Sequence, residues 1–324
     1  MLDKYIRGLV NSRFFIFSVD LFIALYFVVT FLPYKIYTML RPKRLKLSTW
    51  VLETIGIYPI RDQYYEPLFQ KKYLDLDKFS NRRLGKIDFD IAAQLSLLET
   101  FAQLPKDWCA VDQKDRSKDF NIDNGAFVAG DAEFLFNFIR SKKPKRIYEI
   151  GAGQSTKVIS AARRFNNFEN HDSRHVCIEP FEAPWLEDLG VEVIRDKVEN
   201  MDLGIFKALE SGDVLFIDSS HMIRPQGDVL TEYLEIIPLL SPGVFIHIHD
   251  IFTPHDYPVE WVMGEKKFWN EQYLVEMMLI HSDRFKVIAS LNHLKHSQFA
   301  ELKKVCPNLQ QDSEPGSIYL QVVG

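Results

Sequence analysis

The sequence predicts an α/β fold with a doubly wound, Rossmann-like sheet over residues 121–324, preceded by a separate N-terminal part. Two observations predict this fold. An apolar strand at residues 146–150 runs into a glycine-rich turn that opens a helix. Beyond that turn, short apolar segments recur between helical stretches and each ends in polar residues, which is typical of a parallel sheet covered on both faces.

The turn after the first predicted strand has the pattern of a nucleotide-cofactor loop. Gly151 and Gly153 let the backbone approach a ligand without an obstructing Cβ, and a helix start with free N–H groups follows at Ser155 and Thr156. A dinucleotide fingerprint needs a third small residue where Thr156 stands. Because Glu149 would repel a pyrophosphate but can engage the cationic methionyl end of S-adenosylmethionine, the pattern favours a methyl donor.

The next predicted strands also end in polar residues, and ligands bind outside the carboxyl ends of strands in open α/β sheets. The strand at 175–180 carries Glu179 near its end, where such folds place an acid that binds ribose hydroxyls. The strand at 191–196 ends with Asp196, which we expect to flank the adenine ring; the alternative is a solvated aspartate. Two further strands are expected at 213–218 and 243–250.

The motifs E-x-G-x-G, Ile-Glu-Pro, Phe-Ile-Asp-x-x-His and His-x-His-Asp-Ile-Phe follow one another as they do in class I S-adenosylmethionine-dependent methyltransferases. Over roughly residues 120–324 the chain resembles the small-molecule and sugar O-methyltransferases of that family. The resemblance implies a seven-stranded sheet whose last strand, at 316–323, is antiparallel and lies beside the fifth. It also implies S-adenosylmethionine as the cofactor, with the binding residues Glu149, Gly151, Gly153, Ser155, Thr156, Glu179, Asp196 and Asp218.

Methyl transfer to oxygen needs an in-line nucleophile and a group that removes its proton. His221, three residues after Asp218, is the first candidate base because imidazole titrates near neutral pH. Metal-dependent catechol-type relatives carry a catalytic lysine in this segment. The alternative is that His221 caps the next helix. His249 is the second candidate, and its alternative role is that of a packed strand residue.

Asp218 and Asp250 match two of the carboxylates that hold Mg²⁺ in those relatives. The third ligand of the family, an asparagine directly after the second aspartate, is Ile251 here. Three oxygen ligands are already few for a hard divalent ion. The departure at Ile251 leaves dependence on Mg²⁺ open, and without a metal the two aspartates can orient the histidines or bind substrate hydroxyls.

Aromatic residues on both sides of the predicted crevice are expected to cover the methyl acceptor. Asp256, Tyr257 and Trp261 lie in a segment similar to methyltransferases that act on sugars of antibiotics and glycans. Tyr64 and Tyr65 belong to a Tyr-Tyr-x-Pro segment that resembles the N-terminal lids of that group. Because aromatic side chains with polar tips line sugar pockets well, the sequence predicts a sugar, glycan or other hydroxylated small molecule as acceptor.

Residues 14–32 are almost continuously apolar and about long enough to cross a bilayer as a helix. Asp20 opposes insertion, by around 3 kcal/mol at a helix centre and less away from it. Basic residues crowd the C-terminal flank, which places the catalytic part on the cytoplasmic side. The alternative is a helix packed on a soluble cytoplasmic enzyme. Three parts are thus predicted: a membrane anchor (1–46), a cap (47–120) and the catalytic domain (121–324).

Composition narrows the classes of function. A formal net charge of -5, with no dense basic patch near the predicted crevice, argues against nucleic acid as the main substrate. Three widely spaced cysteines argue against a disulfide framework and a zinc site, and fit a reducing compartment. Two alternative functions stay open: a noncatalytic S-adenosylmethionine-binding scaffold on the same fold, and, less favoured, an NAD(P)-dependent oxidoreductase.

Overall fold

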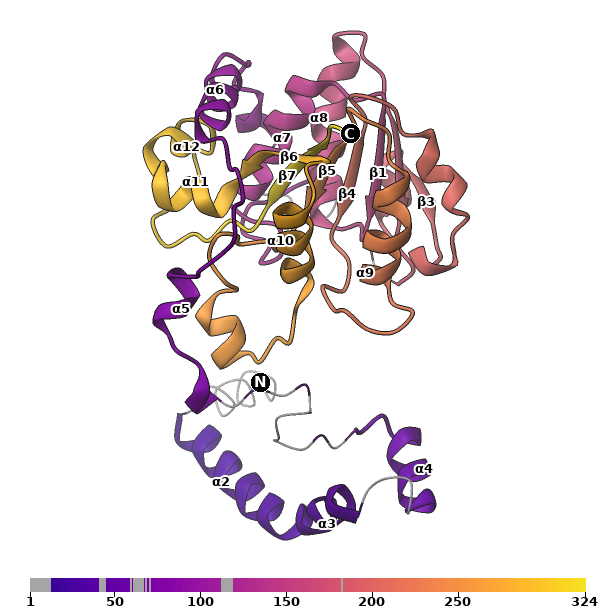
Figure 1. Cartoon of the computed structure of the whole chain (residues 1–324), viewed down its shortest axis with the longest axis vertical. Coiled ribbons are helices and arrows are strands. Elements are labelled where there is room, and N and C mark those ends of the chain that lie inside the picture. Colours follow the sequence, from indigo (N-terminus) through magenta and orange to yellow (C-terminus); the bar gives the residue numbers. More distant parts are fainter. Residues whose placement is uncertain are drawn as a thin grey trace, which may run out of the picture. The chain divides into compact units, whose positions relative to one another are not determined.

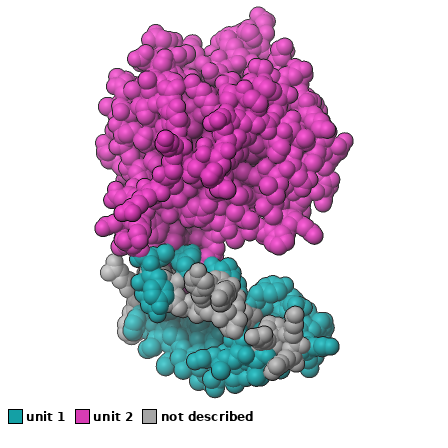
Figure 2. All heavy atoms as spheres, in the orientation of Figure 1, with its two compact units in different colours: residues 1–74 teal, residues 75–324 magenta. Residues whose placement is uncertain are grey.

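The computed structural model of the chain describes residues 13–40, 45–58, 60, 67, 69, 71–111, 119–181 and 183–324. The chain divides into two compact units, residues 1–74 and 75–324 (Figure 2). This division falls inside the region 47–120 that the sequence assigns to a cap. The helix α6 (Ile91–Ala102) belongs to the second unit, where its Leu98 and Phe101 enter the main core.

The second unit is built on a seven-stranded sheet with the order β3-β2-β1-β4-β5-β7-β6 (Figure 1). Its strands are β1 (Arg146–Ile150), β2 (Arg174–Ile178), β3 (Glu192–Ile194), β4 (Val214–Ile217), β5 (Phe245–Ile248), β6 (Phe285–Ser290) and β7 (Ile318–Val322). The first five are parallel, and β7 runs antiparallel to both β5 and β6. The predicted seven-stranded sheet, with its antiparallel last strand beside the fifth, is confirmed.

Helices cover both faces of this sheet (Figure 1). One face packs against helices α6, α7 (Asp131–Lys142), α8 (Gln154–Phe168), α11 (Leu291–Ser297) and α12 (Phe299–Val305). The other face packs against α9 (Asp228–Thr231), η6 (Leu203–Ala208), the π-helix η7 (Glu232–Ile236) and α10 (Glu271–His281). Shorter segments are α5 (Asp77–Ser80), η2 (Lys71–Tyr73), η3 (Asp107–Ala110), η4 (Leu186–Leu189), η5 (Val198–Asn200), η8 (Ile237–Leu239) and the π-helix η9 (Glu260–Gly264).

The central strands are apolar on both faces because helices bury both sides of the sheet. In β1 the side chains alternate, so that Ile147 enters one core while Tyr148 and Ile150 enter the other. Glu149 follows the same alternation and therefore lies on the face that α8 covers. The alternation decides which polar groups at the strand ends point toward a ligand and which point into the protein.

The first unit contains the helices α2 (Arg13–Thr30), α3 (Leu32–Leu40) and α4 (Lys46–Thr54). Among the described residues no one helix has the length and apolar character needed to cross a membrane, whereas α2 and α3 meet both criteria as a pair joined at a 42° bend. The predicted single spanning helix over residues 14–32 is therefore not confirmed. The side chains of α2 are largely exposed, as at Phe22 (72%) and Val28 (77%).

Candidate functional site

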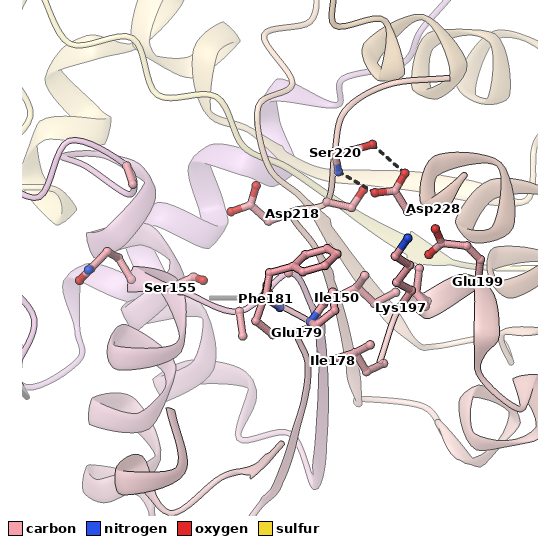
Figure 3. Close-up of a pocket in the computed structure, with 18 of the residues that line it drawn as sticks. Ile150, Ser155, Ile178, Glu179, Phe181, Lys197, Glu199, Asp218, Ser220 and Asp228 are labelled. Carbon is pink, nitrogen blue, oxygen red and sulfur yellow. Dashed lines mark hydrogen bonds between the residues drawn. The ribbon is translucent and has the colours of Figure 1, made fainter. Parts of the chain in front are cut away.

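A cavity of about 740 Å³ opens at the carboxyl ends of β1, β2 and β4 (Figure 3). Its walls come from the glycine turn after β1, the loop after β2, residues 197–199 after β3 and the loop after β4. The predicted cofactor residues that line it are Gly151, Gly153, Ser155, Glu179 and Asp218. The fold thus brings these sequence positions to one crevice, as the strand-end argument predicts.

The two glycines of the turn have different tasks. Gly151 has a φ of +79°, and a Cβ at this position would lie 1.8 Å from the backbone oxygen of Asp218. Only glycine allows the turn to pack this closely on the loop after β4. A Cβ on Gly153 would meet nothing within 4 Å, so this residue leaves space for a ligand.

Glu149 does not line the cavity. Its fully buried carboxylate accepts hydrogen bonds from Ser155 Oγ (2.6 Å) and Thr156 Oγ1 (2.9 Å), and lies 2.8 Å from His175 Nε2. The predicted direct contact with a methionyl ammonium does not fit this arrangement. Glu149 and Thr156 instead hold the first turn of α8 from beneath, and Thr156 Oγ1 also accepts the Gly153 N–H at 3.0 Å.

Of the two predicted acids that follow β2 and β3, Glu179 lines the cavity and Asp196 does not. Glu179 lies at the cavity, where its Oε1 accepts the Phe181 N–H at 2.7 Å (Figure 3). Lys197 Nζ lies 5.9 Å from the centre of the Phe181 ring. Asp196 is exposed and is not a lining residue; its Oδ1 accepts from the Lys197 N–H (2.7 Å) and from Asn200 Nδ2 (2.8 Å). The carboxylate of Asp196 therefore fixes the turn that begins η5 rather than facing a ligand.

Asp218 also belongs to a cluster of two aspartates and two histidines. His221 Nε2 lies 3.3 Å from Asp218 Oδ1 and 3.3 Å from Asp250 Oδ2. His249 Nδ1 lies 3.4 Å from Asp218 Oδ1 and 3.6 Å from Asp250 Oδ2. The sequence singled out all four residues, and the structure brings them together. We call Asp218, His221, His249 and Asp250 the His/Asp cluster.

Further acidic residues face the outer nitrogens of both imidazoles. His221 Nδ1 lies 2.8 Å from Glu271 Oε2, and Tyr233 donates to the other oxygen of this carboxylate at 2.8 Å. His249 Nε2 lies 3.8 Å from Asp131 Oδ2. Glu271 begins α10, where the helix N-terminus favours a negative charge. These supporting residues were not predicted, because only the fold places them beside the two histidines.

The surroundings shift the pKa values within the cluster. Burial alone lowers the pKa of His221, but hydrogen bonds to Asp218 and Glu271 raise it well above its usual value. Burial likewise lowers the pKa of His249, and the charges of Asp250 and Asp218 reverse the effect and raise it. The pKa of Asp250 is raised, chiefly by burial. The carboxylates of the cluster therefore stabilise the protonated, positively charged forms of His221 and His249.

Two members of the cluster have unusual backbones. His221 and Asp250 have φ values of 58° and 56°, a left-handed conformation that costs a non-glycine residue roughly 1–2 kcal/mol. The Asn270 N–H bonds the His221 oxygen at 3.0 Å, and the Ile251 N–H bonds the Gly316 oxygen at 2.7 Å. These contacts hold both strand ends in a conformation that turns the side chains toward each other.

The described residues among the predicted acceptor contacts, Asp256, Tyr257 and Trp261, do not line the 740 Å³ cavity. Trp261 contacts Trp269 edge to face at 5.2 Å, and the Trp269 ring lies 4.4 Å from that of His221, so this aromatic group extends the His/Asp cluster. The hydroxyl of buried Tyr257 accepts the Gln272 N–H at 3.0 Å. Asp256 is engaged elsewhere and accepts from the Tyr273 hydroxyl at 2.9 Å. Tyr64 and Tyr65 lie outside the described residues.

Comparison with known proteins identifies this part of the chain. Residues 148–251 match a family described as a methyltransferase domain, and the match spans the glycine turn, Glu179 and the His/Asp cluster. The chain carries a class I methyltransferase domain. The S-adenosylmethionine-dependent methyltransferase predicted from the sequence is confirmed at the level of the family.

Individual relatives of this methyltransferase domain are distant. An uncharacterised protein from Archaeoglobus fulgidus is 33% identical over 92 residues, which cover 27% of this chain and only 41% of that protein. A solved O-methyltransferase from Bacillus cereus in complex with SAH is 14% identical and covers 78% of this chain and 99% of its own (TM-score 0.35). The MycE methyltransferase, solved with Mg, SAH and mycinamycin VI, is 13% identical. The match covers 71% of this chain and 53% of the MycE chain (TM-score 0.33). Since these scores are low, the assignment rests on the family match and on the strand order of the sheet.

Proposed function

We propose that the methyltransferase domain binds S-adenosylmethionine in the cavity of Figure 3 and transfers its methyl group to a hydroxyl of a small molecule, sugar or glycan. The observation that carries this proposal is the position of Asp218. This carboxylate lines the cavity and also contacts both histidines of the His/Asp cluster. A cofactor and an acceptor on its two sides would meet at this residue, as in-line transfer requires.

The cavity offers matching partners for each end of the cofactor. The Glu179 carboxylate is suited to ribose hydroxyls, because strand-end acids bind them in this type of fold. The first turn of α8, beyond Gly153, presents backbone N–H groups that suit the methionyl carboxylate. The exposed ring of Phe181 (76%) and the neighbouring residues 197–199 provide a surface for adenine.

The His/Asp cluster is the proposed place where the acceptor hydroxyl is held and loses its proton. His221, which is oriented by Glu271, is the proposed general base, with His249 as the second catalytic histidine. Because the pKa of His221 is raised well above its usual value, the imidazole can accept a proton only in its neutral form, and turnover should rise as the pH rises through that pKa. The aromatic group of Tyr257, Trp261 and Trp269 adjoins His221 and supports a ring-shaped acceptor such as a sugar.

Calorimetric titration of the purified full chain with S-adenosylhomocysteine tests the cofactor proposal. We expect one site per chain with micromolar affinity. Competition with NADH distinguishes a methyltransferase from the oxidoreductase alternative, because an oxidoreductase requires that NADH displace S-adenosylhomocysteine. A folded chain that binds neither would contradict the proposal, and binding without any methyl transfer across a panel of hydroxylated sugars would favour the scaffold alternative.

We also propose that α2 and α3 associate with a lipid bilayer, with the catalytic domain on its cytoplasmic side. The helix α2 exposes apolar side chains around its circumference, and a helix that is apolar all round needs an apolar medium. Of the predicted basic flank, Lys35 and Lys46 belong to the described residues, whereas Arg41, Lys43 and Arg44 lie outside them.

A further inference from the structure

Two tryptophans beside the His/Asp cluster hold the side chain of a lysine. Lys267 Nζ lies 3.6 Å from the centre of the Trp261 ring and 4.4 Å from that of Trp269, and the two rings meet edge to face at 5.2 Å. A cation over the face of an aromatic ring is attracted by the ring quadrupole, and indole is the best of the aromatic partners. Because the rings carry no charge, they fix the position of the ammonium and do not neutralise it.

The backbone fastens this group to the loop after β4. The Lys267 N–H bonds the Trp261 oxygen at 2.8 Å. Further along the segment, the Asn270 N–H bonds the His221 oxygen at 3.0 Å, and Asn270 Oδ1 accepts the Ile223 N–H at 2.6 Å. These hydrogen bonds set the position of Lys267 relative to His221.

The ammonium lies close to the proposed base. Lys267 Nζ and the centre of the His221 ring each lie 4.4 Å from the centre of the Trp269 ring, so the two are no further apart than twice this distance. Two hydrogen bonds of about 2.8 Å each, one from the ammonium to an anion and one from a hydroxyl to the imidazole, take up more than half of that span. What remains fits two oxygen atoms on one sugar ring and is too short for an anion on a second ring.

The charges at the two ends determine how an acceptor lies. At the inner end, the carboxylates of Asp218 and Asp250 lie 3.3 Å from His221 Nε2 and would repel an anionic group. At the outer end, the side chain of Lys267 is 28% exposed and attracts such a group. An acceptor that has both a hydroxyl and an anionic group therefore places the hydroxyl at His221 and the anion at Lys267.

Glu265 pairs with Lys267 in this structure, and a ligand can replace it. Glu265 Oε2 lies 3.3 Å from Lys267 Nζ, and the Glu265 side chain is 48% exposed. Solvent screens a pair as exposed as this, so the pair contributes little to stability. An anionic group of a ligand can displace the Glu265 carboxylate while the two tryptophans keep the ammonium in place.

We infer that Lys267, held by Trp261 and Trp269, recognises an anionic group of the methyl acceptor. The acceptor class is a sugar with a carboxylate or a phosphate on the same ring unit as the hydroxyl that is methylated. This inference rests on the proposed function, because it takes the His/Asp cluster as the place of the acceptor hydroxyl.

Binding of simple sugars to the full chain, followed by ligand-observed NMR with and without S-adenosylhomocysteine, tests the inference. The probes are the hexuronic acids, the hexose phosphates and the neutral hexoses of the gluco, galacto and manno series. We expect at least one anionic sugar to bind about tenfold more tightly than the neutral sugar of its series, the effect of one hydrogen bond to a charged group. The uronic acids and the phosphates show which anion is preferred. Neutral sugars that bind as tightly as both anionic kinds, or no binding of any anionic sugar at millimolar concentration, would overturn the inference.

Charge variants locate the anion. Lys267→Gln should remove the preference for anionic sugars and leave the affinity for neutral sugars unchanged. Lys267→Arg should retain the preference, because guanidinium also stacks on aromatic rings and binds carboxylates and phosphates. Glu265→Gln removes the competing carboxylate and should strengthen the binding of anionic sugars. Lys266→Gln is the matched control, because Lys266 is an exposed lysine next in the chain, and it should bind as the unmodified chain does.

A preference that survives in Lys267→Gln, or that Lys266→Gln removes to the same extent, would overturn the inference. Titration with S-adenosylhomocysteine shows whether each variant is folded, since neither Lys267 nor Glu265 lines the cofactor cavity. Should Lys267→Gln fail to fold, Glu265→Gln decides the question, because unchanged binding of anionic sugars to that variant would also overturn the inference. An unmodified chain that binds no S-adenosylhomocysteine would contradict the proposed function, whereas one that binds it without preferring anionic sugars would contradict the role of Lys267 alone.

Discussion

At the scale of single residues, the glycine turn positions the site because Gly151 has no side chain. Gly151 has a left-handed backbone and lies against the backbone of Asp218, the residue shared by the cavity and the His/Asp cluster. In the proposed function, the closeness of these two segments sets the distance between the cofactor and the acceptor. A side chain at Gly151 would force them apart.

Replacement of each glycine by alanine should show that Gly151 is needed for stability and Gly153 for cofactor binding. Gly151→Ala should lower the free energy of unfolding by several kcal/mol, because a left-handed alanine costs about 1 kcal/mol and its Cβ overlaps a backbone oxygen. Gly153→Ala should leave stability within about 0.5 kcal/mol and weaken S-adenosylhomocysteine binding, since its Cβ points into open space. Urea unfolding and calorimetry measure both. Equal loss of stability in the two variants would contradict the different tasks assigned to these glycines.

Replacement of Glu179 should affect cofactor binding, whereas replacement of His221 should affect turnover. Glu179→Ala removes the predicted ribose contact and should weaken S-adenosylhomocysteine binding by about 10–100-fold, the effect of one or two hydrogen bonds to a charged group. His221→Ala should abolish most turnover and leave this affinity nearly unchanged, because the imidazole is the proposed base and does not line the cofactor cavity. Glu301→Ala is the control, because Glu301 is an acid on α12 that pairs with exposed Lys304 and does not line the cavity. An equal loss of cofactor affinity in the first two variants would contradict the assignment.

Sequence reasoning found the residues at the strand ends but not the direction in which each side chain points. Asp218, His221, His249 and Asp250 could be predicted because the carboxyl ends of neighbouring parallel strands meet. Glu149 was expected to face the ligand, yet the register of β1 against β2 places it opposite Cys177 and beside His175, under the turn. Which face a strand residue occupies depends on the helix that covers it, and that is a property of the fold.

At the scale of elements, the strands β1 to β5 and β7 were predictable and β6 was not. The central strands are largely apolar, as expected where helices bury both faces, and β3, at one edge of the sheet, was still marked by its apolar residues before Asp196. The strand β6 lies at the edge of the sheet and is half exposed, so its residues Phe285–Ser290 form no continuous apolar run. The placement of β7 beside β5 came from the resemblance to a family and could not come from periodicity.

The segment before α6 is held to α10 by a buried ion pair, which gives a prediction at this scale. Arg82 Nη2 donates to Glu276 Oε2 at 2.6 Å, and Arg82 Nη1 donates to the His255 oxygen at 3.2 Å. Arg82→Ala leaves the Glu276 carboxylate buried without this partner and should cost about 3–5 kcal/mol. Urea unfolding measures the loss.

The matched control is Arg174→Ala. Arg174 pairs with Glu192, but the two side chains are 54% and 55% exposed, so solvent screens the pair and its loss should cost about 0–1 kcal/mol. If both arginine variants lost the same stability, the segment around Arg82 would not be held by its ion pair.

At the scale of the whole molecule, the two units differ in what surrounds their apolar residues. In the second unit the large apolar side chains form two cores on the two faces of the sheet. In the first unit, the described part of α2 exposes Phe17, Phe22, Leu25, Val28 and Val29 by more than 60% each. Folding of the second unit follows from burial inside the protein, whereas the apolar side chains of α2 are left exposed.

The bilayer is the partner that we propose for α2, and flotation with lipid vesicles tests it. The full chain should float with both zwitterionic and anionic vesicles and remain bound at high salt, because apolar burial rather than charge attraction holds it. The double variant Phe22→Asp, Val28→Asp should lose most binding, since each aspartate adds about 3 kcal/mol to the cost of insertion at a helix centre. Phe168→Asp, at an 85% exposed residue that ends α8, controls for added charge on the second unit and should float unchanged. A full chain that stays unbound with both kinds of vesicle, or a double variant that floats as well as the control, would show that the apolar surface of α2 meets protein instead.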